Sequence, residues 1–285
     1  MLRSIRCVEI EIHSYCNRKC QWCPNSKLRR DQIKIMPEDL YLKIMNELKE
    51  KGFNGVISYS RYNEPMADIK LLKKRVEQAK NILPGVKLVS NTNGDYLDCL
   101  SLDRLLLDDL TVMDYDCMGL EQCLEKLKRV GARVALVDYP FIYALYKNIN
   151  ILYYVDWPKN VEIVDRGGFL KKPVKLDGKK MNWLKNKERR SNPCFEPYNF
   201  IGIDYTGRVT PCCQIRSDFS KHNKYILGDL NHQSLSGIML DKKAVNFRDL
   251  MSSYNASRYP DPCKYCQKSA GRYTRENCGI EYNID

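Results

Sequence analysis

The sequence predicts an α/β protein with a small second domain, and three observations support this fold class. Apolar runs of strand length alternate with segments of helical period up to about residue 166, which is the pattern of a parallel sheet covered by helices. After DRGGFL (165–170) the pattern changes to a hairpin and short helices, and cysteines gather once in each part. We therefore expect a barrel domain at 1–170, a basic linker at 171–193 and a small domain at 194–285.

The first domain is expected to repeat a strand and a helix several times. Apolar residues at spacings of three and four predict a helix from Pro37 to Gly52, a second over 69–79 and a third that ends at Gly131. Strands are expected at VEIEIHS (8–14), GVISYS (55–60), VKLVSN (86–91), LTVMDYD (110–116), RVALVDY (133–139), NILYYV (150–155) and NVEIVD (160–165). Such units predict an open or closed α/β barrel.

The second domain begins with a predicted β-hairpin. YNFIGID (198–204) and RVTPCC (208–213) flank the turn Tyr205-Thr206-Gly207, and glycine suits the third position of such a turn. A short strand at LGDL, a helical stretch over 235–246 and a cysteine pair in DPCKYCQ follow.

Composition restricts the function classes. The 285 residues are 44% hydrophobic and 29% charged, and no run reaches the ~18 apolar residues of a membrane span. The first residues lack a secretory signal pattern, so we expect a cytoplasmic protein. Residues 168–192 contain nine Lys or Arg and two acidic residues. This segment therefore carries +7 of the net charge of +12. This segment is interpreted as a solvated linker face, with a rim for an acidic partner as the alternative.

The cysteines indicate a metal site. In a reducing compartment 13 cysteines do not suggest a disulfide framework, and the chain has only three histidines. Cys16, Cys20 and Cys23 lie in HSYCNRKCQWCPN, directly after the first predicted strand. Their spacing indicates a three-thiolate site, and a structural zinc with Cys7 as a distant fourth ligand is the alternative.

CxxxCxxC after the first barrel strand resembles the radical S-adenosylmethionine (SAM) family. The resemblance implies a partial (β/α)6 barrel in which Cys16, Cys20 and Cys23 hold a [4Fe-4S] cluster whose open iron binds SAM. RYNEP matches the SAM-binding turn of the family at Glu64 and Pro65 but carries Tyr62 and Asn63 in place of its glycines. The resemblance also implies SAM contacts from Ser90, Asn91 and Asn93, and an adenine contact from Trp22.

A second cysteine set, Cys194, Cys212, Cys263 and Cys266, has the four thiolates of a closed site. It resembles the auxiliary [4Fe-4S] domain of the same family in its short "twitch" form, because Arg272 and Glu276 stand where the longer SPASM form would continue its cysteines. A zinc ribbon is the alternative.

The resemblance implies reductive cleavage of SAM to a 5′-deoxyadenosyl radical, abstraction of a substrate hydrogen, and oxidation through the auxiliary cluster. The motifs are most similar to enzymes that dehydrogenate cyclitols in aminoglycoside biosynthesis, which implies a sugar- or cyclitol-like substrate, a substrate-binding Arg166 and a flavodoxin- or ferredoxin-type reductant. Epimerisation, with Cys213 or Cys278 as hydrogen donor, is one alternative.

Modification of a ribosomal peptide or a nucleotide is another alternative, although little chain precedes Cys16 to bind a leader peptide. A zinc-bound basic module that binds nucleic acid is the non-catalytic alternative. We expect neither nucleic acid nor membrane as a partner.

Overall fold

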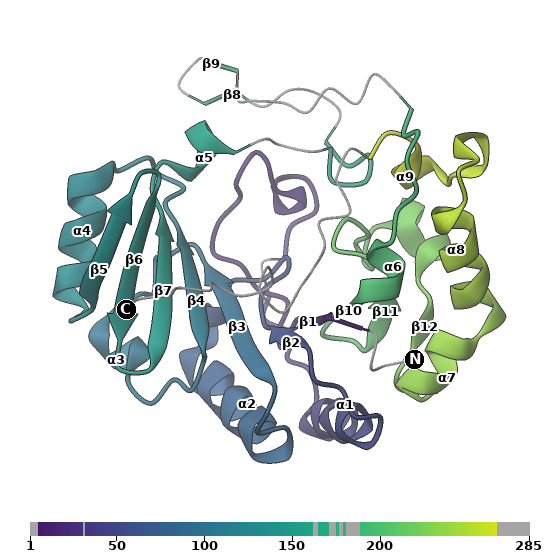
Figure 1. Cartoon of the computed structure of the whole chain (residues 1–285), viewed down its shortest axis with the longest axis horizontal. Coiled ribbons are helices and arrows are strands. Elements are labelled where there is room, and N and C mark those ends of the chain that lie inside the picture. The colour runs from purple at the N-terminus through teal and green to yellow at the C-terminus, as the bar shows by residue number, and fades with distance from the viewer. Residues whose placement is uncertain are drawn as a thin grey trace.

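The computed structural model describes residues 5–30, 32–161, 165–170, 175–176, 179–180 and 189–266. Its main feature is a ten-stranded sheet in the order β12-β11-β10-β1-β2-β3-β4-β7-β6-β5. Figure 1 shows this sheet curved around the loop that follows β1, with α1, α2 and α4 on the outer side. The strands are β1 (Cys7–Ile10), β2 (Val56–Ser58), β3 (Lys87–Thr92), β4 (Asp109–Met113), β5 (Arg133–Asp138), β6 (Phe141–Tyr146), β7 (Ile149–Tyr154), β10 (Phe200–Ile203), β11 (Arg208–Thr210) and β12 (Gly228–Asp229).

The helices follow the apolar spacing of the sequence. On α1 the residues at helical spacing, Leu40, Ile44 and Leu48, are buried, which is the stripe that an amphipathic helix packs against a sheet. The α-helices are α1 (Glu38–Glu50), α2 (Ile69–Ile82), α3 (Cys99–Leu102), α4 (Leu120–Arg129), α5 (Trp157–Asn160), α6 (Glu196–Asn199), α7 (Leu235–Leu240), α8 (Lys242–Ser252) and α9 (Asp261–Lys264). Short 3-10 helices are η2 (Pro24–Ser26), η3 (Pro65–Asp68), η4 (Ser220–Tyr225) and η5 (Ala256–Arg258), and β8 (Lys175–Leu176) pairs with β9 (Lys179–Lys180).

Six neighbouring strands run parallel, in the order β10-β1-β2-β3-β4-β7. This arrangement bears out the predicted α/β class and its partial barrel. β10, from the predicted second domain, pairs in register with β1, Cys7 opposite Phe200. The sheet therefore continues from the first predicted domain into the second, although the starts of β1 and β10, at residues 7 and 200, are 193 positions apart in the chain.

The last part of the barrel differs from the prediction. β5, β6 and β7 form an antiparallel meander, and β6 was not among the predicted strands. Loops of only two residues, 139–140 and 147–148, join these strands, so the chain runs from β5 through β6 to β7 without an intervening helix, as antiparallel neighbours allow. The segment NVEIVD is not a strand where it is described: Asn160 ends α5, and residues 162–164 lie outside the described residues.

The small domain matches its prediction in the hairpin and differs in the helices. β10 and β11 pair antiparallel around Asp204–Gly207, with Gly207 at a φ of 90°, a conformation that favours glycine. The single predicted helical stretch is two helices, because Asp241 ends α7 and begins α8. Its carboxylate accepts a hydrogen bond from the Lys243 backbone N–H at 2.8 Å, as an N-cap does.

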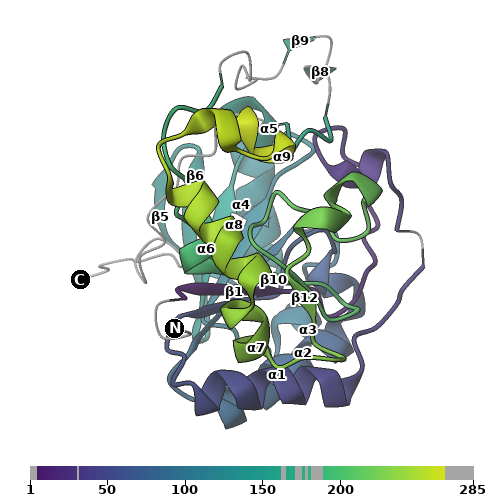
Figure 2. The ribbon, with the colours of Figure 1, turned by 90° about the vertical axis from the view of Figure 1, so that its right-hand side faces the viewer.

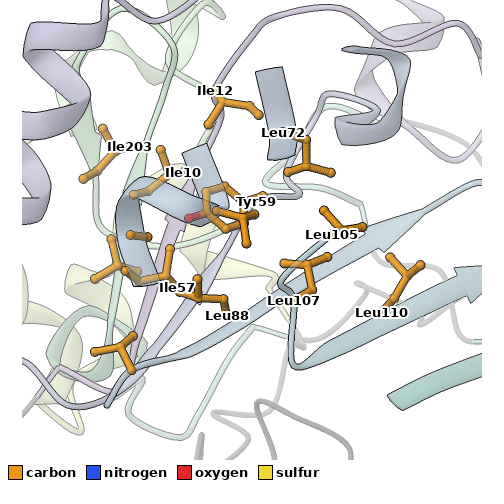
Figure 3. Close-up of a cluster of buried hydrophobic side chains, with 14 of the residues drawn as sticks. Ile10, Ile12, Ile57, Tyr59, Leu72, Leu88, Leu105, Leu107, Leu110 and Ile203 are labelled. Carbon is orange, nitrogen blue, oxygen red and sulfur yellow. The ribbon is translucent and has the colours of Figure 1, made fainter. Parts of the chain in front are cut away.

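One apolar core lies between the sheet and the helices that cover it (Figure 3). Ile10, Ile57, Leu88 and Leu110 come from the successive strands β1 to β4 and are fully buried. Because this core fixes the strands, the loops at their carboxyl ends start from defined positions. In parallel α/β proteins this is the edge at which functional residues gather.

Candidate active site

A cavity of about 260 Å³ lies at the carboxyl ends of the parallel strands. Each of β1 to β4 and β7 contributes the residues that follow it. The lining includes Cys16, Cys20, Trp22, Cys23 and Asn25 after β1, Arg61–Glu64 after β2, Thr92 and Asn93 at the end of β3, Tyr115 after β4, and Trp157 after β7, together with Arg166 and Cys213. Residues far apart in the chain therefore meet in one site.

Cys16, Cys20 and Cys23 all line this cavity and are partly buried. Burial raises the pKa of Cys16 to about 11 and that of Cys20 to about 12. A buried thiol of this kind becomes a thiolate when a cation is bound beside it. Free, converging, partly buried thiols on a short loop thus fit a soft iron–sulfur group.

No three Cys, His, Asp or Glu residues in the described part of the chain lie close enough together to hold a single metal ion. Iron–sulfur clusters are held through several irons, so their cysteines stand farther apart than the ligands of one ion. The finding on single-ion sites is therefore compatible with a cluster held by the three cysteines.

The cysteine loop is fastened to the loops after β3 and β4. Arg18 donates hydrogen bonds to both carboxylate oxygens of Asp95 and to both of Asp116, at 2.6–2.7 Å in the three longer contacts. Asn17 donates to Asp95 at 2.6 Å and accepts from Asn93 Nδ2 at 2.9 Å. Bidentate guanidinium–carboxylate pairs fix orientation as well as distance, so the loop has a defined path between Cys16 and Cys20.

Glu64 lies in the turn after β2 and lines the cavity. Three hydrogen-bond donors surround its carboxylate. Its carboxylate accepts hydrogen bonds from the backbone N–H of Met66 at 3.1 Å, from Thr92 Oγ1 at 2.7 Å and from the Asn93 N–H at 2.8 Å. Burial nevertheless raises the pKa of Glu64 to about 7. A buried carboxylate with this pKa is stabilised when a ligand brings a positive charge beside it.

Three aromatic rings form one wall. Trp22 stacks at a tilt on Tyr115 and on Trp157, with ring centroids 5.5 and 5.7 Å apart, and Tyr115 meets Trp157 edge to face at 5.1 Å. These residues come from the loops after β1, β4 and β7. A rigid aromatic wall of this size can bind a flat ring such as a nucleobase.

The structure brings most of the predicted site residues together. Trp22, Glu64, Asn91, Asn93, Arg166 and Cys213 all line the cavity. Ser90 is not among the lining residues: it is buried, and its hydroxyl donates to the Asn91 carbonyl at 3.4 Å. Successive strand residues face opposite sides, which accounts for the difference between positions 90 and 91. Cys278 lies outside the described residues.

Sequence reasoning missed a group of buried arginines around Tyr62. The guanidiniums of Arg30, Arg61 and Arg216 each lie over the Tyr62 ring, 5.2–5.7 Å from its centroid. The Tyr62 hydroxyl donates to the Cys213 carbonyl at 2.7 Å. The only signal in the sequence was that Tyr62 departs from the glycine of the family turn.

The four cysteines of the second set line another, smaller cavity. Cys194, Cys212, Cys263 and Cys266 surround it together with the apolar side chains of Phe247 and Met251. Burial raises the pKa of Cys212 and of Cys263 well above the usual thiol value. Four thiols around an enclosed, largely apolar space fit a closed iron–sulfur site.

Arg190 holds this second site together. Its guanidinium donates to the carbonyls of Asn192, Cys266 and Pro193 at 2.8, 3.0 and 3.1 Å, and its backbone N–H donates to the Lys264 carbonyl at 2.7 Å. The Cys194 N–H donates to the Met251 carbonyl at 2.7 Å. The chain segments that carry three of the thiols are thereby tied to one another.

A parallel barrel with three cysteines after its first strand, followed by a four-cysteine domain, defines a class: the radical SAM enzymes with a C-terminal iron–sulfur domain. The comparisons agree with that class. Residues 194–267 match the SPASM family, described as an iron–sulfur cluster-binding domain. This match and the relatives described next support a radical SAM enzyme with SAM and iron–sulfur clusters as its cofactors. No helix in the described residues is both long and apolar enough to cross a bilayer.

Among individual proteins, the chain is 26% identical over 259 residues to the S-adenosyl-L-methionine-dependent 2-deoxy-scyllo-inosamine dehydrogenase of Niallia circulans, covering 91% of each chain. BtrN, solved with AdoMet and 2-DOIA, has the same fold with a TM-score of 0.67 and 23% identity, over 95% of this chain and 96% of that chain. Streptococcus suis SuiB, solved with its precursor peptide SuiA, gives a TM-score of 0.56 and 13% identity, over 93% and 76%. These last two likenesses concern the fold.

Proposed function

We propose that this enzyme dehydrogenates a polyhydroxylated small molecule of the sugar or cyclitol kind, in the biosynthesis of a natural product. One observation carries the proposal: two consecutive residues open onto two different sites. Cys212 lines the four-thiol cavity, and Cys213 lines the cavity of the three-cysteine loop. A substrate bound in the first cavity would thus lie next to a redox centre held in the second.

In this proposal Cys16, Cys20 and Cys23 hold one [4Fe-4S] cluster and Cys194, Cys212, Cys263 and Cys266 hold the other. Residues 1–170 form the barrel domain, 171–193 the linker and 194–285 the auxiliary domain. Glu64 accepts the SAM ammonium, Asn91 and Asn93 contact its polar groups, and Trp22 packs on its adenine. Bound together, the first cluster and SAM supply a radical that removes a hydrogen atom from carbon.

Oxidation of an alcohol to a ketone requires the loss of two electrons and two protons. The hydrogen atom from carbon carries one of each, the hydroxyl proton leaves to a base, and the remaining electron passes to the auxiliary site. Arg166 reaches into the cavity, where its guanidinium can orient the reacting hydroxyl and favour its deprotonation. A flavodoxin- or ferredoxin-type protein would supply the electron that starts the reaction.

The test is anaerobic reconstitution of the wild type and of two variants, Cys16/Cys20/Cys23→Ala and Cys263/Cys266→Ala. About eight irons in the wild type and about four in each variant are expected if each set holds one [4Fe-4S] cluster. 5′-Deoxyadenosine should form in the wild type and disappear in the triple variant. The double variant should still cleave SAM but lose ketone formation. Zinc in place of iron, or no SAM cleavage by a fully loaded and reduced protein, would contradict the proposal.

Epimerisation is the second candidate, and the position of Cys213 favours it. Cys213 lines the cavity, so its thiol could return a hydrogen atom to a substrate radical bound there. In that case a Cys213→Ser variant would cleave SAM and release no epimer, and product formed in D2O by the wild type would carry one carbon-bound deuterium. A dehydrogenase would instead keep making ketone after the same substitution.

Peptide modification receives less support from the comparisons. SuiB, solved with its precursor peptide, is 13% identical to this chain, whereas the 2-deoxy-scyllo-inosamine dehydrogenase is 26% identical over 91% of each chain. A small substrate therefore has the stronger support.

A further inference from the structure

Arg61 presents N–H groups to the cavity that make no hydrogen bond within the described residues. Its side chain is only 2% exposed, and it lines the cavity. Nη2 donates to the carbonyls of Ile215 and Cys212, the latter at 3.4 Å. Nε lies 3.6 Å from Glu9 Oε2, an ion-pair distance rather than a hydrogen bond. Nε and Nη1 make no hydrogen bond within the described residues.

The place of the Arg61 guanidinium is fixed by its surroundings. A Cβ on Gly202 of β10 would lie 2.3 Å from Nη1, so only a glycine at this position leaves room for the guanidinium on that side. On another side it lies over the Tyr62 ring, 5.5 Å from the centroid. A guanidinium confined in this way keeps its unused N–H groups in place for a ligand.

Arg166 presents a second buried donor to the same cavity. Its Nε is buried without a hydrogen-bond partner in the described residues, and its φ of 54° turns the chain sharply before Gly167. His222 holds this turn, because its Nε2 lies 2.9 Å from the Gly167 carbonyl. His222 Nδ1 accepts the Arg216 N–H at 2.9 Å, which leaves Nε2 as the protonated nitrogen that donates.

The other charged groups of the cavity are already engaged. Arg18 is occupied by two carboxylates, and Glu64 accepts three hydrogen bonds. Two guanidiniums, Arg61 and Arg166, then retain N–H groups that make no hydrogen bond within the described residues, and the Glu9 carboxylate lies 3.6 Å from Arg61 Nε. A buried guanidinium N–H without an acceptor costs free energy, so the bound molecule must bring oxygen acceptors to both.

We propose that the substrate binds through hydroxyl or acidic oxygens to Arg61 and Arg166 and carries no ammonium group. This inference rests on the proposed function of the same cavity. An ammonium has three donors and no acceptor, so it would leave both guanidiniums unsatisfied and add a third positive charge against the single carboxylate of Glu9. The curated relative, by contrast, is named for an inosamine, which is an amine.

The test is isothermal titration of the anaerobically reconstituted protein, saturated with SAM, with three probes of similar size: scyllo-inositol, glucuronate and scyllo-inosamine. The neutral or the acidic probe is expected to bind at least tenfold more tightly than the amine, since one hydrogen bond to a charged group is worth about a factor of ten or more. An amine that binds as tightly as the better oxygen probe overturns the inference, and so does failure of both oxygen probes to bind. The two oxygen probes separate a need for an acid from a need for hydroxyls.

Arg61→Met should remove most of that preference by weakening the better oxygen probe about tenfold and the amine much less. If the methionine variant does not fold, Arg61→Lys keeps the charge, and its point-like ammonium should still lose the paired contacts of the planar fork. The control is Arg208→Met, an exposed β11 arginine outside the cavity, which should bind all three probes as the wild type does. An unchanged preference in folded Arg61 variants contradicts the inference.

Binding is measured without turnover, so the two proposals fail separately. Wild-type protein that selects the oxygen probes but never cleaves SAM contradicts the proposed function alone. Protein that cleaves SAM and oxidises an amino cyclitol in preference to its neutral counterpart contradicts this inference alone.

Discussion

Arg216 offers the sharpest test of how the two halves of the site are held together. Its side chain is fully buried. The guanidinium donates to both carboxylate oxygens of Asp218, at 2.5 and 3.1 Å, to Asn25 Oδ1 at 2.8 Å and to the Leu28 carbonyl at 2.8 Å. Asn25 and Leu28 follow the third cysteine of the barrel loop, whereas Arg216 follows the hairpin of the second domain.

The substitution Arg216→Met retains most of the apolar volume and removes every one of these donors. Two neutral acceptors then lose a partner, at about 1 kcal/mol each, and a carboxylate loses charged hydrogen bonds worth about 2 kcal/mol. Asp218 keeps one partner, Arg30, at 2.8 Å, so its charge is not left wholly uncompensated. We therefore expect the free energy of unfolding to fall by about 4 kcal/mol, within the range for breaking a buried ion pair.

The assay is anaerobic urea unfolding of the reconstituted protein, followed by far-UV circular dichroism and by the visible absorption of the clusters. Coincidence of the two transitions is required before free energies are compared. Arg208→Met is the matched control, because the exposed Arg208 side chain makes one long hydrogen bond within the described residues, 3.3 Å to the Ser217 carbonyl. This substitution should cost less than about 1 kcal/mol. A loss below 1 kcal/mol for Arg216→Met would refute the reasoning that this network joins the two halves.

Three further outcomes follow from the site and the core. Burial raises the pKa of Glu64 to about 7, and the protonated form that dominates below that pH does not attract the SAM ammonium. The affinity for SAM, measured by titration calorimetry, should therefore fall about tenfold from pH 8 to pH 6. The control is a Glu64→Gln variant, whose affinity should not depend on pH. Arg18→Leu removes the ion pairs to Asp95 and Asp116, worth about 1–2 kcal/mol together. A chelator should then extract iron from the first site about tenfold faster than from the wild type. An unchanged rate would show that these ion pairs do not hold the cysteine loop. Gly55→Ala places a Cβ 2.3 Å from the Arg6 carbonyl oxygen, and the clash should lower the free energy of unfolding by about 3 kcal/mol. The control is Gly85→Ala, where a Cβ meets nothing within 4 Å, and it should not lower the thermal midpoint.

The local parts of the fold could be predicted because their signals are local. The apolar spacing of α1 and α2 and the alternation of strand and helix segments each lie within about fifteen residues, and burial of those faces is what the structure shows. β6 escaped prediction because two-residue loops on both sides left no stretch of turn residues to mark it. The pairing of β10 with β1 depends on residues nearly two hundred positions apart, which no window of the sequence reports.

The candidate site likewise contains residues that could be predicted from local motifs and residues that could not. The cysteine spacings, Glu64 and the asparagines after β3 could be found because each motif sits within a few residues of a strand end. The contacts of Arg61 could not be found, since its partners are Glu9 on β1 and the carbonyls of Cys212 and Ile215. An arginine in a turn is ordinarily a solvated residue, and packing against β1 and β10 converts this one into a buried donor.

Tyr62 explains why the turn after β2 departs from the glycines of the family. Its N–H donates to Glu11 Oε1 at 2.9 Å, its carbonyl accepts from Asn25 Nδ2 at 2.7 Å, and its hydroxyl donates to the Cys213 carbonyl at 2.7 Å. One residue is therefore hydrogen-bonded to the residue that follows β1, to the cysteine loop and to the segment that follows the hairpin of the second domain. Because these groups are buried and hydrogen-bonded, the spacing between the two thiol cavities is set by this contact and by the pairing of β10 with β1.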